Sequence, residues 1–306
     1  MRVFVTGASG HIGSAVLPEL LAAGHQVTGL ARSDASAGKL AALGVEVHRG
    51  DLDDLDGLRE AAAAADGVVH LAYKHEALQT GDMAMAADSD FRALAAIGDA
   101  LADSGTGKAL VIASGTLMLA HAVTGRPGTE ADVLEAGPRI DSENAVIALA
   151  ERGVRSSAVR LPPLVHSDLD HHGFTAALIG LARANGYAGF PGDGASRWPA
   201  GHTLDAARLF RLALEKAPAG SRLHAVGDEG VPQREIAEAI GRNLDLPTKS
   251  VPAEQLPEYF RFLAGFIGLD NPTSAARTRE LLDWAPTHPG LIEDIDAGHY
   301  FAAQAG

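Results

Sequence analysis

The stretch that decides the fold is Thr6-Gly7-Ala8-Ser9-Gly10-His11-Ile12-Gly13, which directly follows the apolar run Arg2–Thr6. Its glycines stand between this predicted strand and a predicted helix at residues 11–23. A tight strand-to-helix turn needs a residue without a Cβ atom, and close packing of the helix on the strand needs another. Free backbone amides at the start of such a helix attract a diphosphate. The stretch therefore predicts a dinucleotide-binding turn made of Gly7, Ser9, Gly10, His11, Ile12 and Gly13.

The first half of the chain alternates short β-branched runs with longer segments rich in alanine and leucine. Short apolar runs separated by helices are typical of a parallel sheet that is buried on both faces. We expect strands at residues 2–6, 26–31, 45–48, 67–72, 109–113 and 155–161, and helices at 11–23, 54–65, 88–104 and 142–152. This order predicts an α/β fold with a doubly wound parallel sheet, the Rossmann architecture.

The second half of the chain has a different rhythm. Residues 163–202 are rich in loop-forming residues, with one expected helix near 175–184, whereas 204–216 is again a helix with Thr203 as its expected cap. A last strand is expected at 222–226, and the pattern after Val231 is mainly helical and broken by prolines. We therefore expect a dinucleotide-binding domain at 1–162 and 203–227, and a smaller, mainly helical substrate-binding cap at 163–202 and 228–306.

Length and charge exclude several classes of function. The chain has 306 residues, enough for a large core, and 25 basic against 39 acidic residues give a net charge of −14. Nucleic-acid binding relies on basic patches, so we expect no nucleic-acid partner. The absence of cysteine removes disulfides and thiolate zinc sites. Because the N-terminus lacks the features of a signal peptide and no apolar run reaches membrane-spanning length, we expect a cytoplasmic protein without a membrane partner.

The residues after the second predicted strand bear on the choice of cofactor. An acidic residue there accepts from the ribose 2′-hydroxyl of NAD, whereas an arginine suits the 2′-phosphate of NADP. The chain has Arg32 and Ser33 in this place, and Asp34 lies slightly beyond it. We therefore expect NADP(H) in preference to NAD(H). Asp51 and Leu52, after the third strand, are placed for the adenine edge, although Asp51 could equally cap the helix that follows.

These motifs resemble, in the same order along the chain, those of the extended and atypical short-chain dehydrogenase/reductases, a superfamily that includes nucleotide-sugar epimerases and dehydratases. The segments that carry the resemblance are residues 6–13, Gly50-Asp51-Leu52, His70-Leu71-Ala72, residues 112–116, residues 160–166 and residues 198–205. The resemblance implies that Leu71 and Ala72 contact the cofactor. It also implies that Pro162 lies in the stretch lining the nicotinamide ring.

The chain departs from this superfamily at the catalytic pair. The resemblance implies a Tyr-x-x-x-Lys pair, in which the tyrosine transfers a proton and the lysine holds the nicotinamide ribose. None of the four tyrosines has a lysine four residues later. Counting back from Glu143 and Gly153 places Glu135 at the tyrosine position and Arg139 at the lysine position. This departure points to the atypical subgroup, which lacks the pair.

Arg139 and Glu135 are therefore expected to replace the pair in the site. A guanidinium stays charged near neutral pH, so Arg139 could hold the cofactor ribose or stabilise an oxyanion but could not donate a proton. Glu135 could transfer a proton only if burial raised its pKa, and it could equally be a solvated loop carboxylate. Ser114 and Thr116, at the end of the fifth strand, are further catalytic candidates. We expect Thr116 to face the substrate, with local turn bonding as the alternative.

The 13 histidines raise the question of a metal site. His171 and His172 are adjacent, so their side chains diverge, and the sequence has no recognised metal-ligand spacing. We therefore expect no metal. His166 and His171 follow the nicotinamide-lining segment and could instead line a substrate cleft.

Three functions are compatible with these features. The leading hypothesis is an NADP(H)-dependent oxidoreductase that transfers a hydride between nicotinamide and a small carbonyl or alcohol substrate. The alternatives are a non-catalytic NAD(P)H sensor, suggested by the missing pair, and a sugar epimerase or dehydratase. By the resemblance, a homodimer would form through the helices at 88–104 and 142–152.

Overall fold

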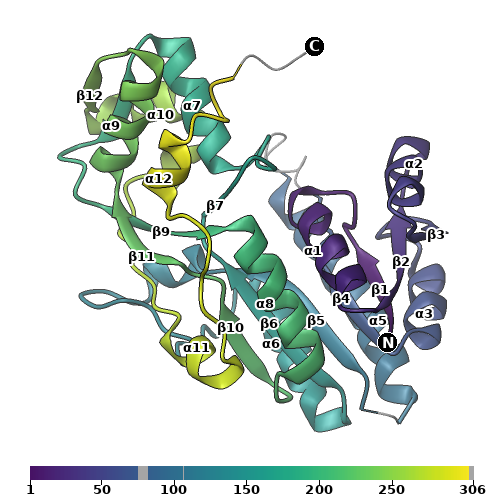
Figure 1. Cartoon of the computed structure of the whole chain (residues 1–306). Helices are drawn as coiled ribbons and strands as arrows, with labels where there is room; N and C mark the ends of the chain where they lie inside the picture. The colour runs from purple at the N-terminus through teal and green to yellow at the C-terminus, as the bar shows by residue number, and fades with distance from the viewer. Residues whose placement is uncertain (75–81, 106, 303–306) are drawn as a thin grey trace.

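The computed structural model describes residues 1–74, 82–105 and 107–302, and its centre is a parallel sheet of seven strands (Figure 1). Neighbouring strands follow the order β10-β6-β5-β4-β1-β2-β3, and all of these pairings are parallel. The predicted doubly wound sheet is thus confirmed. Ligands of such sheets bind outside the carboxyl ends of the strands, where the strand order reverses between β1 and β4. The strands are β1 (Arg2–Thr6), β2 (Gln26–Ala31), β3 (Glu46–Arg49), β4 (Gly67–His70), β5 (Ala109–Gly115), β6 (Arg155–Leu161) and β10 (Ser221–His224).

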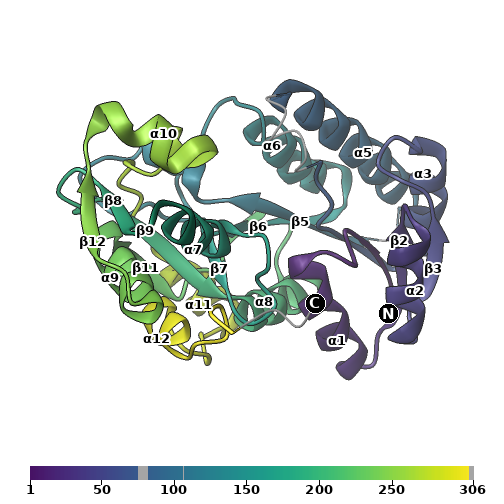
Figure 2. The ribbon, with the colours of Figure 1, turned by 90° about the horizontal axis from the view of Figure 1, so that it is seen from above.

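Helices cover both faces of this sheet (Figure 2). Side chains alternate between the faces along each strand, so Val3 and Val5 of β1 pack into one apolar core and Phe4 packs into the other. The core that contains Val3 is covered by the helices α1 (His11–Ala22), α2 (Asp34–Ala42) and α8 (Thr203–Lys216). The core that contains Phe4, on the other face, is covered by α3 (Leu55–Ala64), α5 (Met83–Asp103) and α6 (Ile140–Ala148). No helix within the described ranges combines the length and the apolar character needed to cross a membrane.

Most elements of the large sheet lie near their predicted positions, but α2 was not predicted, and the starts of α5 and α8 are two of several helix starts that differ. The bounds of β1, β2 and β6 are those expected. α5 begins before residue 88 because Asp82 caps it, its side chain accepting from the amide of Met85 at 3.2 Å. The expected cap of α8 was wrong: Thr203 is its first residue, and the Nδ1 atom of His202 accepts from the amide of Leu204 at 3.2 Å.

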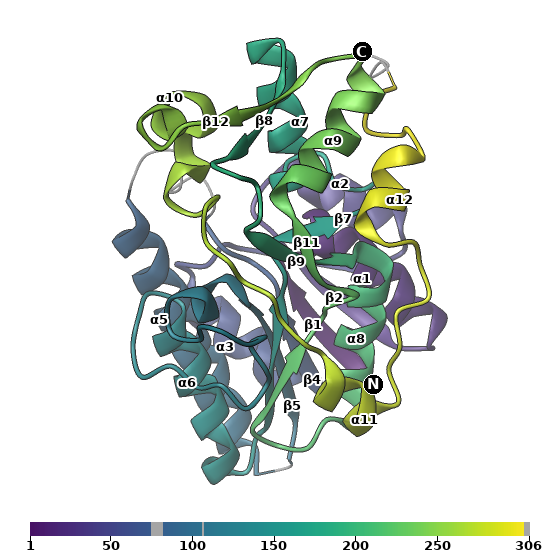
Figure 3. The ribbon, with the colours of Figure 1, turned by 90° about the vertical axis from the view of Figure 1, so that its left-hand side faces the viewer.

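Residues 164–202 and most of the described chain after β10 form a cap (Figure 3). The cap has its own apolar core, which includes the buried side chains of Trp198 and Phe260. Its helices are α7 (Phe174–Asn185), α9 (Gln233–Leu244), α10 (Leu256–Phe260) and α12 (Leu291–Asp296). It also contains two small sheets that the sequence did not predict, with orders β11-β9-β7 and β12-β8. Their strands are β7 (Leu164–His166), β8 (Ala188–Pro191), β9 (Arg197–His202), β11 (Asp228–Pro232) and β12 (Thr248–Val251).

The C-terminal part of the chain is not confined to the cap. α11 (Ala276–Leu282) packs against α8 and β10, and Ala275, Leu282 and Trp284 belong to the same core as Val3. The indole Nε1 atom of Trp284 donates to the carbonyl of Asp205 in α8 at 3.0 Å. Residues 275–284, which the sequence analysis assigned to the cap, therefore pack on the large sheet instead.

Candidate functional site

The turn between β1 and α1 has the geometry of a dinucleotide cradle. Gly7 adopts a φ of +65°, and a Cβ atom there would lie 2.6 Å from the backbone nitrogen of Ala72. A Cβ atom on Gly13 would lie 2.3 Å from the carbonyl oxygen of Gly7. Both obstacles are backbone atoms, so the turn accepts only glycine at these two positions. The turn therefore packs directly on Leu71 and Ala72, which follow β4.

The N-terminus of α1 is open to an anion. Gly10 occupies the cap position without a side-chain cap, and the first turn of the helix has no acidic residue. The amides of His11, Ile12 and Gly13 have no partner within the helix, and the helix dipole adds a partial positive charge. Ser9 is partly exposed in the same turn. These residues fit the diphosphate of a dinucleotide, which would accept hydrogen bonds from the helix amides.

Two arginines flank the carboxyl end of β2, the position that meets the adenosine ribose in such folds. Arg32 is exposed directly after the strand. Arg49 ends the neighbouring strand and donates to the carbonyl of Ser33 at 2.8 Å and to the carboxylate of Asp34 at 2.7 Å. Ser33 caps α2, its hydroxyl accepting from the amide of Ser36 at 3.2 Å. Arg49 was not predicted as a cofactor residue because it comes from a different strand.

Asp51 and Leu52 follow β3. The Oδ1 atom of Asp51 accepts from the amide of Asp53 at 2.8 Å in a local turn. The cap of α3 is Asp54, whose carboxylate accepts from the amide of Gly57 at 3.1 Å, so the alternative of Asp51 as a helix cap was wrong. Leu52 is buried in the core beneath α3. Asp51 is exposed, and its contact with adenine stays a prediction.

A buried chain of polar side chains lies beside Leu71 and Ala72, which follow β4. The Oγ1 atom of Thr6 lies 3.0 Å from Nδ1 of His70 and accepts from the amide of Ala72 at 3.3 Å. The Nε2 atom of His70 lies 3.3 Å from Oδ1 of Asp90 in α5. Burial raises the pKa of Asp90, but the hydrogen bond and charge of His70, with the charge of Arg139, leave it below its usual value. Asp90 is therefore a buried anion beside the carboxyl edge of the sheet.

Arg139 lies at this edge, immediately before α6. Its Nη2 atom donates to the carbonyl of Ala113 in β5 at 2.7 Å, and its guanidinium carbon lies 4.2 Å from the centre of the Tyr73 ring. A guanidinium in this position is attracted to the electron-rich face of the ring. Tyr73 follows β4, so the pair spans the carboxyl ends of two adjacent strands. The sequence predicted Arg139 as a site residue but missed Tyr73, because Tyr73 does not have the spacing of the family pair.

The other three catalytic candidates are not placed as expected. Glu135 is exposed, so the burial that an acid–base role requires is absent, and the solvated-carboxylate alternative fits it. Thr116 does not face a cleft: it is fully buried, its amide donates to the carbonyl of Leu161 at 2.9 Å, and its hydroxyl has no hydrogen-bond partner among the described residues. The hydroxyl of Ser114 donates to a carboxylate oxygen of Glu143 at 2.6 Å. Ser114 therefore has a structural partner inside the protein.

Glu143 anchors a buried network behind Ser114. Its Oε1 atom accepts from Nη2 of Arg160 at 2.6 Å and from Nε of Arg222 at 2.8 Å. Its Oε2 atom accepts from Ser114 and, at 3.0 Å, from Nε of Arg160. Burial raises the pKa of Glu143, but the hydrogen bond and charge of Arg160, with Ser114 and Arg222, leave it below its usual value. The network ties α6 to β5, β6 and β10.

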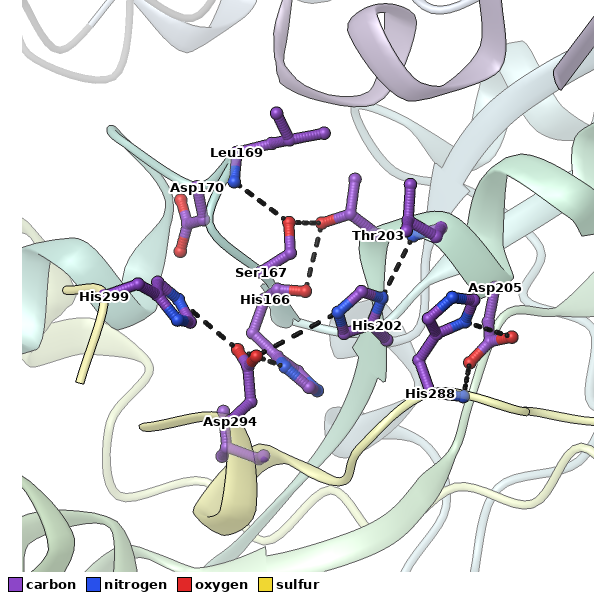
Figure 4. Close-up of polar contacts among 12 residues, drawn as sticks. His166, Ser167, Leu169, Asp170, His202, Thr203, Asp205, His288, Asp294 and His299 are labelled. Atoms are coloured by element: carbon purple, nitrogen blue, oxygen red, sulfur yellow. Dashed lines mark hydrogen bonds and ion pairs between the residues drawn. The ribbon is translucent and has the colours of Figure 1, made fainter. Parts of the chain in front are cut away.

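The segment after β6 leads from the sheet into the cap. Pro162 is buried, with its ring 3.3 Å from the position that a Cβ atom on Gly201 would take. His166, one of the two histidines that could have lined a cleft, is fully buried, and its Nδ1 atom lies 2.9 Å from a carboxylate oxygen of Asp294 (Figure 4). His166 therefore holds α12 against β7, while His171 is exposed on the surface.

The side chain of His11 points from the glycine turn toward α8. Its Nε2 atom lies 2.9 Å from Oγ1 of Thr203, which donates to the carbonyl of His166 at 3.1 Å. The hydroxyl of Ser167 donates to Thr203 at 2.9 Å (Figure 4). Burial lowers the pKa of the His11 imidazole despite the nearby carboxylate of Asp170. The turn and the cap are thus joined by neutral hydrogen bonds.

His202 and Asp205, three residues apart, meet His288 of the C-terminal segment in a cluster of potential metal ligands. His202, Asp205 and His288 each offer one ligand atom, and these atoms lie within 4.8 Å of one another (Figure 4). The two imidazoles are stacked, with centroids 4.6 Å apart and planes inclined by 9°. Lone pairs in two parallel stacked rings do not converge on one ion. Asp205 also accepts from the amides of Thr287 and His288, so the cluster is a hydrogen-bonded junction between α8 and the C-terminal segment.

The fold and the site define a class of protein. A doubly wound sheet carries a glycine turn and an open helix N-terminus at its carboxyl edge, and both fit a nicotinamide dinucleotide. The chain belongs to the NAD dependent epimerase/dehydratase family, whose model matches residues 3–226. The superfamily resemblance of the sequence motifs is confirmed by this match, while membership of the atypical subgroup stays a prediction.

Similar proteins are known from fungi and bacteria. An uncharacterized protein of Schizosaccharomyces pombe is 44% identical over 303 residues, which cover 98% of this chain and 100% of that protein. An uncharacterized protein of Saccharomyces cerevisiae is 38% identical over 304 residues, covering 98% and 99%. The dTDP-glucose 4,6-dehydratase DesIV of Streptomyces venezuelae, solved as a double mutant with NAD and DAU bound, has a TM-score of 0.80 at 19% identity and covers 99% of this chain and 98% of its own. That likeness shows a shared fold.

Proposed function

We propose that this chain is an NADP(H)-dependent oxidoreductase that transfers a hydride between nicotinamide and a small carbonyl or alcohol. The observation that carries the proposal is the cradle at the start of α1, where Gly7 and Gly13 permit the tight turn and the first helix amides have neither a side-chain cap nor an acidic neighbour. The family match and the NAD bound to DesIV support a nicotinamide cofactor. The cofactor would supply the hydride, and the protein would bind and orient it.

The preference for NADP(H) rests on the charges at the carboxyl end of β2. Arg32 and Arg49 place two guanidinium groups there. The carboxylate of Asp34, which would repel a 2′-phosphate, is paired with Arg49 at 2.7 Å. Because guanidinium groups bind phosphate through charge-assisted hydrogen bonds, this arrangement favours the phosphorylated ribose.

Calorimetric titration with NADPH and NADH tests this proposal. We expect the wild-type protein to bind NADPH more tightly than NADH, and Arg32→Ala to weaken NADPH binding alone. A charge-assisted hydrogen bond contributes about 1.5–3 kcal/mol, which corresponds to about 10- to 150-fold in affinity. Arg59→Ala is the matched control, because Arg59 pairs with Asp56 on the exposed surface of α3. Equal losses for both cofactors in Arg32→Ala would remove the case for NADP(H), and no binding of either would refute the function.

A non-catalytic cofactor sensor is the second candidate. It is favoured by the absence of the Tyr-x-x-x-Lys pair together with the burial of Thr116 and the exposure of Glu135. Oxidation of NADPH in the presence of a panel of small aldehydes, ketones and quinones separates the two functions. Turnover with any of these compounds supports the oxidoreductase. Tight NADPH binding without turnover, and with different affinities for the oxidised and reduced forms, supports the sensor. A sugar epimerase or dehydratase, which would use the same fold, is disfavoured by Arg32 and by the missing pair.

A further inference from the structure

Reduction of a carbonyl needs a proton donor, and the chain has four tyrosines. Two of them already use their hydroxyls inside the cap. The hydroxyl of Tyr259 donates to the carbonyl of Tyr187 at 2.7 Å, and that of Tyr300 donates to Asp170 at 3.1 Å. Tyr187 itself packs against Tyr259, with ring centroids 4.9 Å apart, in the same part of the molecule. Tyr73 is therefore the tyrosine that the fold brings to the carboxyl edge of the large sheet.

The backbone beside Tyr73 is fixed against the dinucleotide cradle. A Cβ atom on Gly7 would collide with the backbone of Leu71 and Ala72, so the cradle and this segment are in direct contact. The amide of Ala72 donates to the hydroxyl of Thr6 at 3.3 Å, and the amide of Leu71 donates to the carbonyl of Thr6 at 3.2 Å. Tyr73 is the next residue along the chain. Its position is thus set by the same turn that would hold the cofactor.

Arg139 faces Tyr73 from the neighbouring strand end. The guanidinium stands 4.2 Å from the ring centre and is itself anchored to the carbonyl of Ala113. By sequence count, Arg139 occupies the position of the lysine in the family pair. A permanent cation at this place would stabilise a phenolate in the way that the missing lysine would have done. This edge of the sheet therefore holds a phenol and a cation, as the family pair would. The phenol, however, belongs to Tyr73, which follows β4.

The protonation state of Tyr73 suits a donor. Burial raises the pKa of the phenol, the charge of Arg139 lowers it, the charge of Asp90 raises it, and the net pKa is above the ordinary value. The phenol is therefore protonated throughout the neutral range. A protonated phenol can donate its proton to a carbonyl oxygen, and the guanidinium of Arg139 offsets part of the rise in the pKa that burial causes.

We propose that Tyr73 is the proton donor of the reduction and that Arg139 stabilises the phenolate that remains. The proposal rests on the oxidoreductase function proposed above. As the carbonyl carbon receives the hydride, the electron pair of its π bond moves to the oxygen. The phenolic O–H bond of Tyr73 breaks while a new O–H bond forms on that oxygen. The phenolate stays beside the Arg139 guanidinium until it takes a proton from water.

Steady-state reduction of the carbonyl panel with NADPH tests the role of Tyr73. Tyr73→Phe keeps the ring against Arg139 and removes only the hydroxyl, so we expect NADPH binding to change less than twofold while kcat falls by at least about 100-fold, the usual effect of losing an acid–base group. Tyr187→Phe is the matched control and should leave both quantities unchanged. If the wild-type enzyme turns over and Tyr73→Phe equals it, the assignment of Tyr73 fails while the function stands. If the wild-type enzyme binds NADPH but reduces nothing, both fail.

A measurement on the protein without cofactor tests the partnership of Arg139 and Tyr73. The ultraviolet absorbance of ionised tyrosine, followed against pH in the wild type and in Tyr73→Phe, isolates the ionisation of Tyr73 by difference. We expect Arg139→Gln to move this ionisation to higher pH, because the guanidinium lowers the phenol pKa, and Arg139→Lys to restore it in part. An ionisation that is the same in wild type and Arg139→Gln would overturn the role given to Arg139, whatever the activity of the enzyme.

Discussion

Glu143→Gln is expected to destabilise the protein strongly, because it removes the only carboxylate among the described partners of Arg160 and Arg222. The Oε1 atom accepts charge-assisted hydrogen bonds from both guanidinium groups, at 2.6 and 2.8 Å. Each such bond contributes about 1.5–3 kcal/mol, and the neutral amide keeps one acceptor oxygen but loses the charge that strengthens both bonds, so the loss reaches at most about 3–6 kcal/mol. That range agrees with the roughly 3–5 kcal/mol found when one partner of a buried ion pair is removed. Proteins have unfolding free energies of about 5–15 kcal/mol, so a large part of the stability is at stake.

Urea unfolding followed by circular dichroism, repeated across pH, is the assay for this variant. The folded-state pKa of Glu143 is below its ordinary value of 4.5, so the stabilisation is fully present above pH 4.5 and is lost as pH falls through the folded-state pKa. The unfolding free energies of wild type and Glu143→Gln should therefore differ at pH 7 and converge in acid. Glu151→Gln, at an exposed position two turns away along the chain, is the control. A loss below about 1 kcal/mol at pH 7 would refute the reasoning, because that is the scale of a surface ion pair.

Two further changes probe the cradle and a buried histidine. Gly13→Ala should abolish NADPH binding in calorimetry, because its Cβ atom would lie 2.3 Å from the carbonyl oxygen of Gly7, whereas Gly180→Ala, with nothing within 4 Å of its Cβ, should bind normally. Normal binding by Gly13→Ala would place the cofactor elsewhere. Burial lowers the pKa of His224 to about 4, so its contribution to stability is complete above pH 6.5 and is lost as pH falls toward 4. His224→Asn keeps a donor for the carbonyl of Ser274 and should flatten the pH dependence of unfolding over this interval, and an unchanged slope would contradict the assignment.

Much of the large sheet could be predicted from the sequence, because buried parallel strands are continuous apolar runs and helices between them show clear periodicity. The bounds of β1, β2 and β6 were found in this way. Three of the cap strands, β8, β9 and β11, escaped prediction because each contains both glycine and proline, which are uncommon inside strands. Their pairing depends on contacts between residues far apart in the chain, as in the parallel pairing of Thr248 with Ala188.

The site could be predicted where a local motif dictates the backbone and not where it depends on tertiary contacts. Gly7 and Gly13 are required by the turn itself, so spacing alone identified them. Glu135 was chosen by counting along a family motif, and nothing in the sequence shows that it is exposed. Tyr73 and Arg139 meet because β4 and β5 are neighbours in the sheet. Such a pair becomes visible only when the strand order is known.

The path of the chain between the sheet and the cap limits how this protein could be divided. The chain leaves the sheet after β6, returns for α8 and β10, leaves again, and returns once more for α11 and Trp284 before it enters the cap helix α12. Neither half is a continuous piece of polypeptide. The substrate specificity could therefore not be changed by exchanging one continuous segment. Any exchange of the cap must replace several separate segments and keep every connection between the cap and the sheet.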